Sequence, residues 1–267
     1  MVAAATQHPE TKVFQQRVKY FDGRISGSAV VGLDTFIKDH YSQGFRSLEG
    51  GYNYIEYVLP AVTVDSKGAQ LWLWYKDGPG YLENFYYSYT PEWGIHIPSG
   101  RVEPLQVKTD EIDIFNNIFG VYLTYQHQSN GYVGSINSAW NDIGGRNDRW
   151  NFHLYYFDDA MMYFDSGSSK TARVRAPITG GDNKGLCVGC RENSNMFLQL
   201  NGTTLAVKGD AYEGKLKGGQ RIELKTDSGG IWFSGIFLGK SIEMMNASRL
   251  GSIWNKLQSS VDPNRGF

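Results

Sequence analysis

The chain has 267 residues, of which 41% are apolar and 20% are charged, and its formal net charge is −1. This balance is typical of one large folded domain or two small ones, and it excludes a disordered chain. The charge argues against nucleic-acid binding, no apolar run approaches the roughly 18 residues of a membrane span, and two cysteines are too few for a disulfide scaffold.

Glycine and aromatic residues are abundant, with 32 Gly, 17 Tyr, 14 Phe and 7 Trp. This combination indicates many short strands joined by tight turns. Two interpretations of the aromatic residues stay open. They fill the core of an all-β fold, or some of them form a face that stacks on sugars.

The N-terminal residues 1–32 mix polar and small side chains, and we interpret them as an arm or docking segment with one strand around residues 13–21. Apolar side chains then recur at helical spacing from Leu33 to Tyr41. Asp34 offers an N-cap and Gly44 stops the run, which predicts a helix of about three turns.

From residue 52 onward the apolar period shifts towards two, which is typical of strands. Alternation predicts strands at residues 71–75, 119–125, 152–156, 172–175 and 221–225. The segment 231–238 is apolar on both faces and predicts a central, covered strand. Asn201-Gly202 lies between two alternating runs, and this pair predicts a two-residue hairpin over residues 196–207.

Helical spacing returns near the C-terminus, where five apolar residues form one stripe: Leu250, Ile253, Trp254, Leu257 and Val261. Asn246 or Ser248 provides the cap, and Pro263 ends the helix. We therefore predict two parts, an N-terminal arm over residues 1–32 and one domain over residues 33–267.

The order of these motifs resembles a known family. Residues 185–191, followed by the hairpin at 197–206, look like the core of laminin G-like and concanavalin A-like jelly rolls. Residues 233–239 with the helix after them are similar to the last strand and terminal helix of such domains in bacteriophage structural proteins. The resemblance implies an all-β fold, an antiparallel two-sheet jelly-roll sandwich with a short N-terminal helix and a C-terminal helix.

The same resemblance implies a function. It suggests a non-enzymatic virion structural protein, such as a phage fibre, a receptor-binding adhesin or a decoration protein of the capsid or tail. Its expected partners are other virion proteins, further copies of itself in a homo-oligomer (a trimer by our estimate) and a host-surface glycan. We expect the chain to be made in the host cytoplasm and to reside in the virion. The alternatives are a stand-alone carbohydrate-binding, lectin-like module and a glycoside hydrolase of concanavalin A-like fold.

The acidic segment Glu111-Ile112-Asp113 is the first candidate for catalytic residues. Retaining glycosidases of this fold carry Glu-x-Asp followed by a second glutamate. Phe115 and Asn116 occupy the corresponding positions here, so we predict no catalytic residue. Cys187 and Cys190 form a single CxxC without further metal ligands, which favours a packing role and no metal site.

The loop at residues 137–150 is the predicted binding site, because it combines side chains that bind sugar hydroxyls with side chains that stack or pair with charge. Its candidate residues are Trp140, Asn141, Asp142, Arg146, Asn147, Asp148 and Arg149. The alternative is an ordinary exposed turn. Ca²⁺ fits the Asn and Asp types but no ligand spacing, so we predict no cofactor. The aromatic stretches at residues 72–75 and 85–89 suit a sugar platform, a subunit interface or the core.

Overall fold

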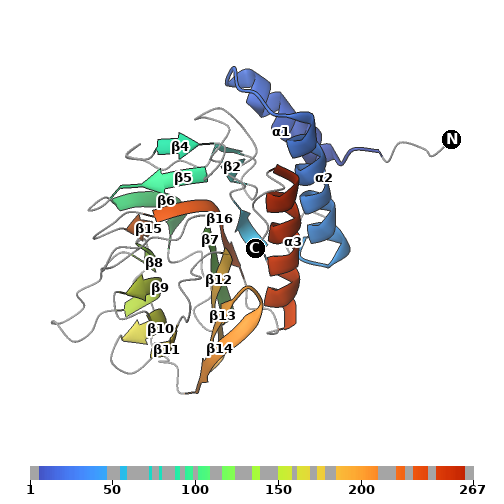
Figure 1. Ribbon diagram of the computed structural model, residues 1–267. Coiled ribbons are helices and arrows are strands. Elements are labelled where there is room, and N and C mark those ends of the chain that lie inside the picture. Colours follow the sequence, from blue (N-terminus) through green and yellow to red (C-terminus); the bar gives the residue numbers. More distant parts are fainter. Residues whose placement is uncertain are drawn as a thin grey trace.

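The computed structural model describes residues 6–46, 55–58, 72–73, 78–79, 88–90, 94–98, 102–108, 116–123, 134–138, 150–157, 161–168, 173–177, 185–209, 221–225, 231–239 and 245–261. Within these residues it contains three helices and three antiparallel sheets (Figure 1). None of the described helices is long and apolar enough to cross a membrane.

The larger sheet has eight strands. Their order is β14 (Thr203–Lys208), β13 (Asn195–Leu200), β12 (Gly185–Glu192), β7 (Asn116–Leu123), β16 (Ile231–Gly239), β5 (Gly94–Ile97) and β4 (Ser88–Thr90), with β1 (Ile55–Val58) also paired to β16. β16 therefore lies inside the sheet, which confirms the central strand expected from its two apolar faces.

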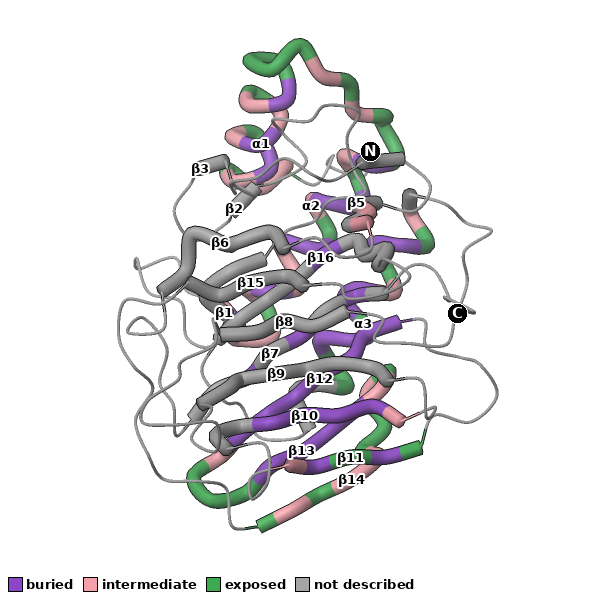
Figure 2. Tube along the Cα trace, turned by 90° about the vertical axis from the view of Figure 1, so that its left-hand side faces the viewer, coloured by how far each residue is buried: buried purple, intermediate pink, exposed green. Residues whose placement is uncertain are grey.

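The smaller sheet has six strands. Their order is β11 (Arg173–Pro177), β10 (Met161–Ser168), β9 (Trp150–Phe157), β8 (Gly134–Ser138), β15 (Arg221–Lys225) and β6 (Val102–Lys108). β2 (Trp72–Leu73) and β3 (Gly78–Pro79) form a separate pair. Figure 2 shows the six-stranded sheet lying in front of the larger one. The two layers touch where Phe164 of β10 lies over Gly189 of β12, because a Cβ at Gly189 would be 2.2 Å from the phenyl ring.

Three helices cover the other face of the larger sheet: α1 (Pro9–Tyr20), α2 (Gly27–Ser42) and α3 (Met245–Val261). α2 and α3 run side by side in Figure 1, and their backbones approach closely because Gly32 faces Ser260. Trp254 of α3 is fully buried. Its ring stacks on Tyr122 of β7 at 5.7 Å and meets Phe36 of α2 edge-on at 4.9 Å, so α3 joins the helical layer to the sheet.

The largest group of buried apolar side chains lies between the helices and the larger sheet. Its members are Phe14, Val18, Leu33, Phe36, Ile37, Phe45, Ile118, Tyr122, Leu186, Val188, Cys190, Phe197, Leu250, Ile253, Trp254 and Leu257. This core cluster includes four of the five residues of the predicted stripe of the last helix, whereas the resemblance alone suggested a core between two sheets. Both faces of β12 are buried, one by the helices and one by the smaller sheet.

The fold class is confirmed at the level of a mostly antiparallel β protein with N-terminal and C-terminal helices. The Asn201-Gly202 hairpin is confirmed as well. Both residues have positive φ, and Leu200 pairs directly with Thr203 across the turn. The last helix begins at Met245, so Asn246 and Ser248 lie inside it and do not precede it.

The predicted strand around residues 13–21 is wrong, because these residues belong to helix α1. His8 caps this helix by accepting from the Glu10 N–H, Pro9 opens it, and Thr11, Phe14 and Val18 are buried at helical spacing. Short-range alternation had hidden this spacing.

The start of the second helix was also placed wrongly. α2 begins at Gly27, with Ser26 as the N-cap that accepts from the Ala29 N–H, so Asp34 lies inside the helix. α2 runs across the boundary proposed between residues 32 and 33. Phe14 and Val18, from the proposed arm, belong to the core cluster. The division into arm and domain stays a prediction.

Candidate functional site

A polar groove of about 630 Å³ runs along α3, between that helix and the turn of the β13–β14 hairpin. We call it the α3 groove. Its polar lining residues are Asn201, Ser248, Ser252, Asn255, Lys256, Ser259 and Ser260. Four of them, Ser248, Ser252, Asn255 and Ser259, recur at positions that share one side of a helix, opposite the buried apolar stripe.

The Asn-Gly turn forms one wall of the groove because glycine lets it approach the helix. A Cβ at Gly202 would lie 2.7 Å from the Ser248 Cα, a distance that no side chain tolerates. Asn201 fastens the turn to the sheet. Its backbone N–H donates to the Leu186 carbonyl, and its side-chain Oδ1 accepts from the Leu186 N–H, each at 2.9 Å. Two hydrogen bonds thus hold the turn to the sheet, and Gly202 packs against α3.

The Asn255 side chain is oriented by a hydrogen bond from Tyr122 of β7. The Tyr122 hydroxyl donates to the Asn255 Oδ1 at 2.6 Å, and burial raises the pKa of Tyr122, which keeps this donor protonated. With its oxygen engaged, the side-chain amide presents its Nδ2 hydrogens as donors. Asn255 is half-buried and lines the groove, so the hydrogen bond from Tyr122 holds this amide in place at the groove.

Lys256 supplies the positive charge of the groove. Its ammonium lies 2.8 Å from the Asp39 Oδ2 of α2, and its side chain is 55% exposed. An exposed pair of this kind contributes about 0–1 kcal/mol to stability. An anionic ligand group can therefore compete for Lys256 at little cost to the fold.

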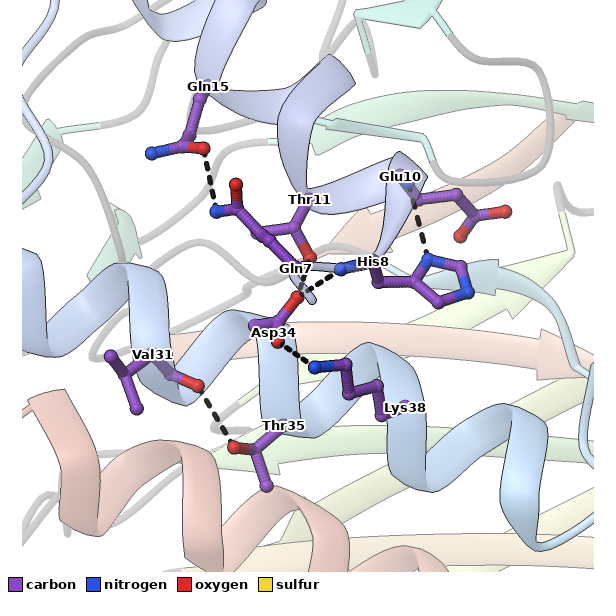
Figure 3. A network of polar contacts seen from close by, with 9 residues as sticks. All are labelled: Gln7, His8, Glu10, Thr11, Gln15, Val31, Asp34, Thr35 and Lys38. Atoms are coloured by element: carbon purple, nitrogen blue, oxygen red, sulfur yellow. Dashed lines mark hydrogen bonds and ion pairs between the residues drawn. The ribbon is translucent and has the colours of Figure 1, made fainter. Parts of the chain in front are cut away.

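A second polar network joins α1 to α2 (Figure 3). Asp34 Oδ1 accepts from the His8 N–H at 2.8 Å and from the Thr11 hydroxyl at 2.7 Å, and Lys38 pairs with the other carboxylate oxygen. Burial alone would raise the pKa of Asp34, but these donors outweigh it and hold the pKa below its usual value. Both oxygens of Asp34 bind groups of the protein itself, so this network fastens α1 and is not a candidate site.

The seven residues of the predicted binding loop, Trp140, Asn141, Asp142, Arg146, Asn147, Asp148 and Arg149, lie outside the described residues. The same holds for Glu111 and Asp113. Cys187 and Cys190 are buried free thiols, and Cys190 belongs to the core cluster. Burial raises the pKa of Cys187 to about 12. Among the residues that the structure describes, no group of His, Cys, Asp and Glu side chains is arranged to hold a metal ion.

No protein-family model matches the sequence, and no curated protein matches it either. Solved structures match in fold. The Trypanosoma rangeli sialidase superposes with a TM-score of 0.55 at 10% identity, covering 86% of this chain and 38% of that one. A protein called HCR/D, solved as a point mutant, gives a TM-score of 0.53 at 11% identity, covering 75% and 51%. The chain thus spans less than two fifths of the sialidase.

A third match is the CBM40 module of the Ruminococcus gnavus IT-sialidase, solved with alpha2,3 sialyllactose bound. It is 15% identical and covers 51% of this chain and 81% of that one, with a TM-score of 0.34 that is too low to compare the folds. None of these three is by name a phage protein or a laminin G domain. The comparisons therefore show a shared β fold and leave the phage part of the resemblance without support.

The comparisons also correct one prediction. We predicted a protein that is not an enzyme, and this was wrong, because most of this chain shares its fold with part of a sialidase, which is an enzyme. The error arose from treating one incomplete Glu-x-Asp motif as decisive. A motif of one glycosidase family does not test for others.

The residues of the α3 groove were missed in the sequence. The available signal was the polar side of the last helix, where Ser248, Ser252, Asn255 and Ser259 follow the helical period. Because polar residues on the outer side of an amphipathic helix are the ordinary case, the pattern alone does not mark a site. The Asn-Gly turn beside them completes the groove, and only the fold brings it there.

Proposed function

We propose that this chain is a carbohydrate-recognising module whose two sheets form a lectin-like jelly roll, and that the α3 groove holds the sugar. The observation that carries the proposal is the fold shared with the Trypanosoma rangeli sialidase over 86% of this chain. Because the chain corresponds to only part of that enzyme, recognition of the glycan is the activity we assign.

The chemistry of the groove suits a hydroxylated ligand. Sugar hydroxyls both donate and accept hydrogen bonds, and the groove offers serine hydroxyls, the amide of Asn255 and the ammonium of Lys256. The acceptors and donors are open to solvent, so they keep their water until a ligand replaces it. A sugar that carries a carboxylate gains the charge of Lys256 in addition.

Among the residues that the structure describes, none with an aromatic ring lines the groove. Hydrogen bonds therefore carry the recognition without the gain from ring stacking, and we expect single-site affinities of about 0.1–10 mM. A homo-oligomer would raise the apparent affinity for a dense glycan surface through avidity.

The test is a titration of the purified chain with sialylated and neutral oligosaccharides, followed by calorimetry and by saturation-transfer NMR. We expect saturable binding that favours the acidic sugars. Lys256→Gln should weaken binding of the acidic sugar about threefold to tenfold. Arg249→Gln is the matched control, because Arg249 is exposed on the same helix and does not line the groove.

A second variant tests the position of the site. Ser252 is exposed within the groove, so Ser252→Trp should fill the groove and abolish binding while the melting temperature stays within a few degrees. Binding that survives this substitution would place the sugar elsewhere. The same samples are assayed for new reducing ends, whose release would add hydrolysis to recognition.

The role on a virion remains part of the proposal and is supported by the sequence resemblance alone. Copurification of the chain with intact particles, and its removal by mild denaturant, would test that role.

A further inference from the structure

The turn that joins α1 to α2 carries an unusual concentration of exposed aromatic surface. Tyr20 is 81% exposed and Phe21 is 37% exposed, and their rings meet edge-on at 5.1 Å. These are two of the four large apolar side chains that are exposed in the described residues. Figure 1 places this end of α1 at the opposite end of the molecule from the β13–β14 hairpin, away from the α3 groove.

A hollow of about 710 Å³ lies at the same turn and is lined by residues that precede and follow Tyr20 and Phe21 in the chain. Val18, a member of the core cluster, and Ile25, which packs against that cluster, give it apolar lining. Lys19, Asp22 and Arg24 also line it. The hollow therefore combines a fixed apolar surface with a mostly basic margin.

Two backbone hydrogen bonds close the turn. The Gly23 N–H donates to the Val18 carbonyl at 2.8 Å and the Asp22 N–H donates to the Lys19 carbonyl at 3.2 Å, a paired cap at the end of a helix. Asp22 adopts φ +51, a conformation that usually favours glycine or asparagine. The sequence thus keeps a charged side chain at a position where glycine would be less strained, beside the hollow.

The charge of this segment differs from that of the whole chain. Residues 12–24 carry four cations, Lys12, Arg17, Lys19 and Arg24, against the single carboxylate of Asp22. The whole chain has a net charge of −1. Exposed aromatic rings next to an arginine are typical of protein interfaces, and the positive charge selects an acidic partner.

We propose that Tyr20, Phe21 and the hollow beside them form a docking surface for an acidic segment of another protein. An apolar side chain of that segment seats against Val18 and Ile25, and its carboxylates pair with Lys19 and Arg24. This site is separate from the α3 groove and does not depend on sugar recognition.

The experiment selects ligands for the immobilised full chain from a library of short random peptides. We expect enrichment of sequences in which Asp and Glu flank one large apolar residue. The double variant Lys19→Glu, Arg24→Glu should bind the enriched peptide about tenfold or more weakly, and Tyr20→Ser should also weaken it. Arg249→Glu makes the same kind of charge change elsewhere and should leave the peptide affinity unchanged.

Three results would overturn the proposal. The first is a library that yields no enrichment of acidic peptides. The second is an Arg249→Glu variant that weakens peptide binding as much as the double variant does. The third is a chain that binds vesicles of phosphatidylserine and phosphatidylcholine through Lys19 and Arg24 and does not bind the peptides. Glycan affinity is measured on the same variants. It should be unchanged, which separates failure of this surface from failure of the α3 groove.

Discussion

The contact between the two sheets at Gly189 and Phe164 gives a sharp test of the layered fold. A Cβ added at Gly189 would lie 2.2, 2.6 and 2.7 Å from three atoms of the Phe164 ring, whereas carbon atoms normally pack at about 3.5–4.0 Å. Phe164 is fully buried, so its ring has no free space into which it can turn. The sheets or the ring must therefore move by about 1 Å.

Overpacking of this kind costs about 1–3 kcal/mol. The loss of backbone freedom in the unfolded chain offsets roughly 0.4–1 kcal/mol of that cost. We therefore expect Gly189→Ala to lower the free energy of unfolding by about 1–2 kcal/mol, with a fall in melting temperature of roughly 2–4 °C per kcal/mol. Chemical denaturation followed by tryptophan fluorescence measures the change.

The decisive measurement is a double-mutant cycle. Phe164→Leu removes the ring atoms that Gly189→Ala would meet, so the alanine should cost little in that background, with a coupling energy of about 1 kcal/mol. Gly209→Ala is the matched control. Gly209 is exposed, and its nearest neighbour in reach of a Cβ is 3.8 Å away. Equal costs of Gly189→Ala in both backgrounds would refute the proposed contact between the sheets.

Three further predictions concern the helical layer and the core. Burial lowers the pKa of His40 from 6.5 to about 4, so protonation of His40 favours unfolding. The free energy of unfolding should be unaffected above pH 6.5 and should fall by about 3 kcal/mol between pH 6.5 and 4. His40→Gln should reduce this loss, as measured by denaturation curves at several pH values. Cys187 and Cys190 should resist alkylation at pH 8 in the folded chain and react on unfolding, because both are buried and the pKa of Cys187 is about 12. Alkylation is followed by mass spectrometry. Fast labelling of the folded chain would contradict the burial of these thiols. Deleting residues 1–32 removes all of α1, with Phe14 and Val18 of the core cluster, and the N-cap and first residues of α2. The remainder should unfold at a melting temperature about 10 °C lower or more, and an unchanged melting curve would show that these residues contribute nothing to stability.

Elements whose signals are local could be predicted from the sequence. The Asn201-Gly202 pair specifies its own turn, and the five-residue stripe from Leu250 to Val261 specifies a helix with one buried side. The two apolar faces of residues 231–238 indicated a strand in the interior of a sheet, where β16 lies. In each case the residues that carry the signal are neighbours along the chain or one helical turn apart.

Features that depend on distant residues could not be predicted. Asp34 looked like a helix cap because its partners, His8 and Thr11, belong to another helix 23 or more residues away. The α3 groove depends on a hairpin turn that precedes the helix by more than 40 residues. The predicted loop at residues 137–150 remains untested, since its candidate residues lie outside those the structure describes.

The most direct test of the account is an NMR titration of the isotope-labelled chain with a sialylated oligosaccharide. The account predicts saturable shifts of the backbone and side-chain amides that line the α3 groove, with the largest at Asn201, Ser252 and Asn255. Saturable binding that moves other amides and leaves these three unchanged would contradict it, as would the absence of any shift at millimolar sugar.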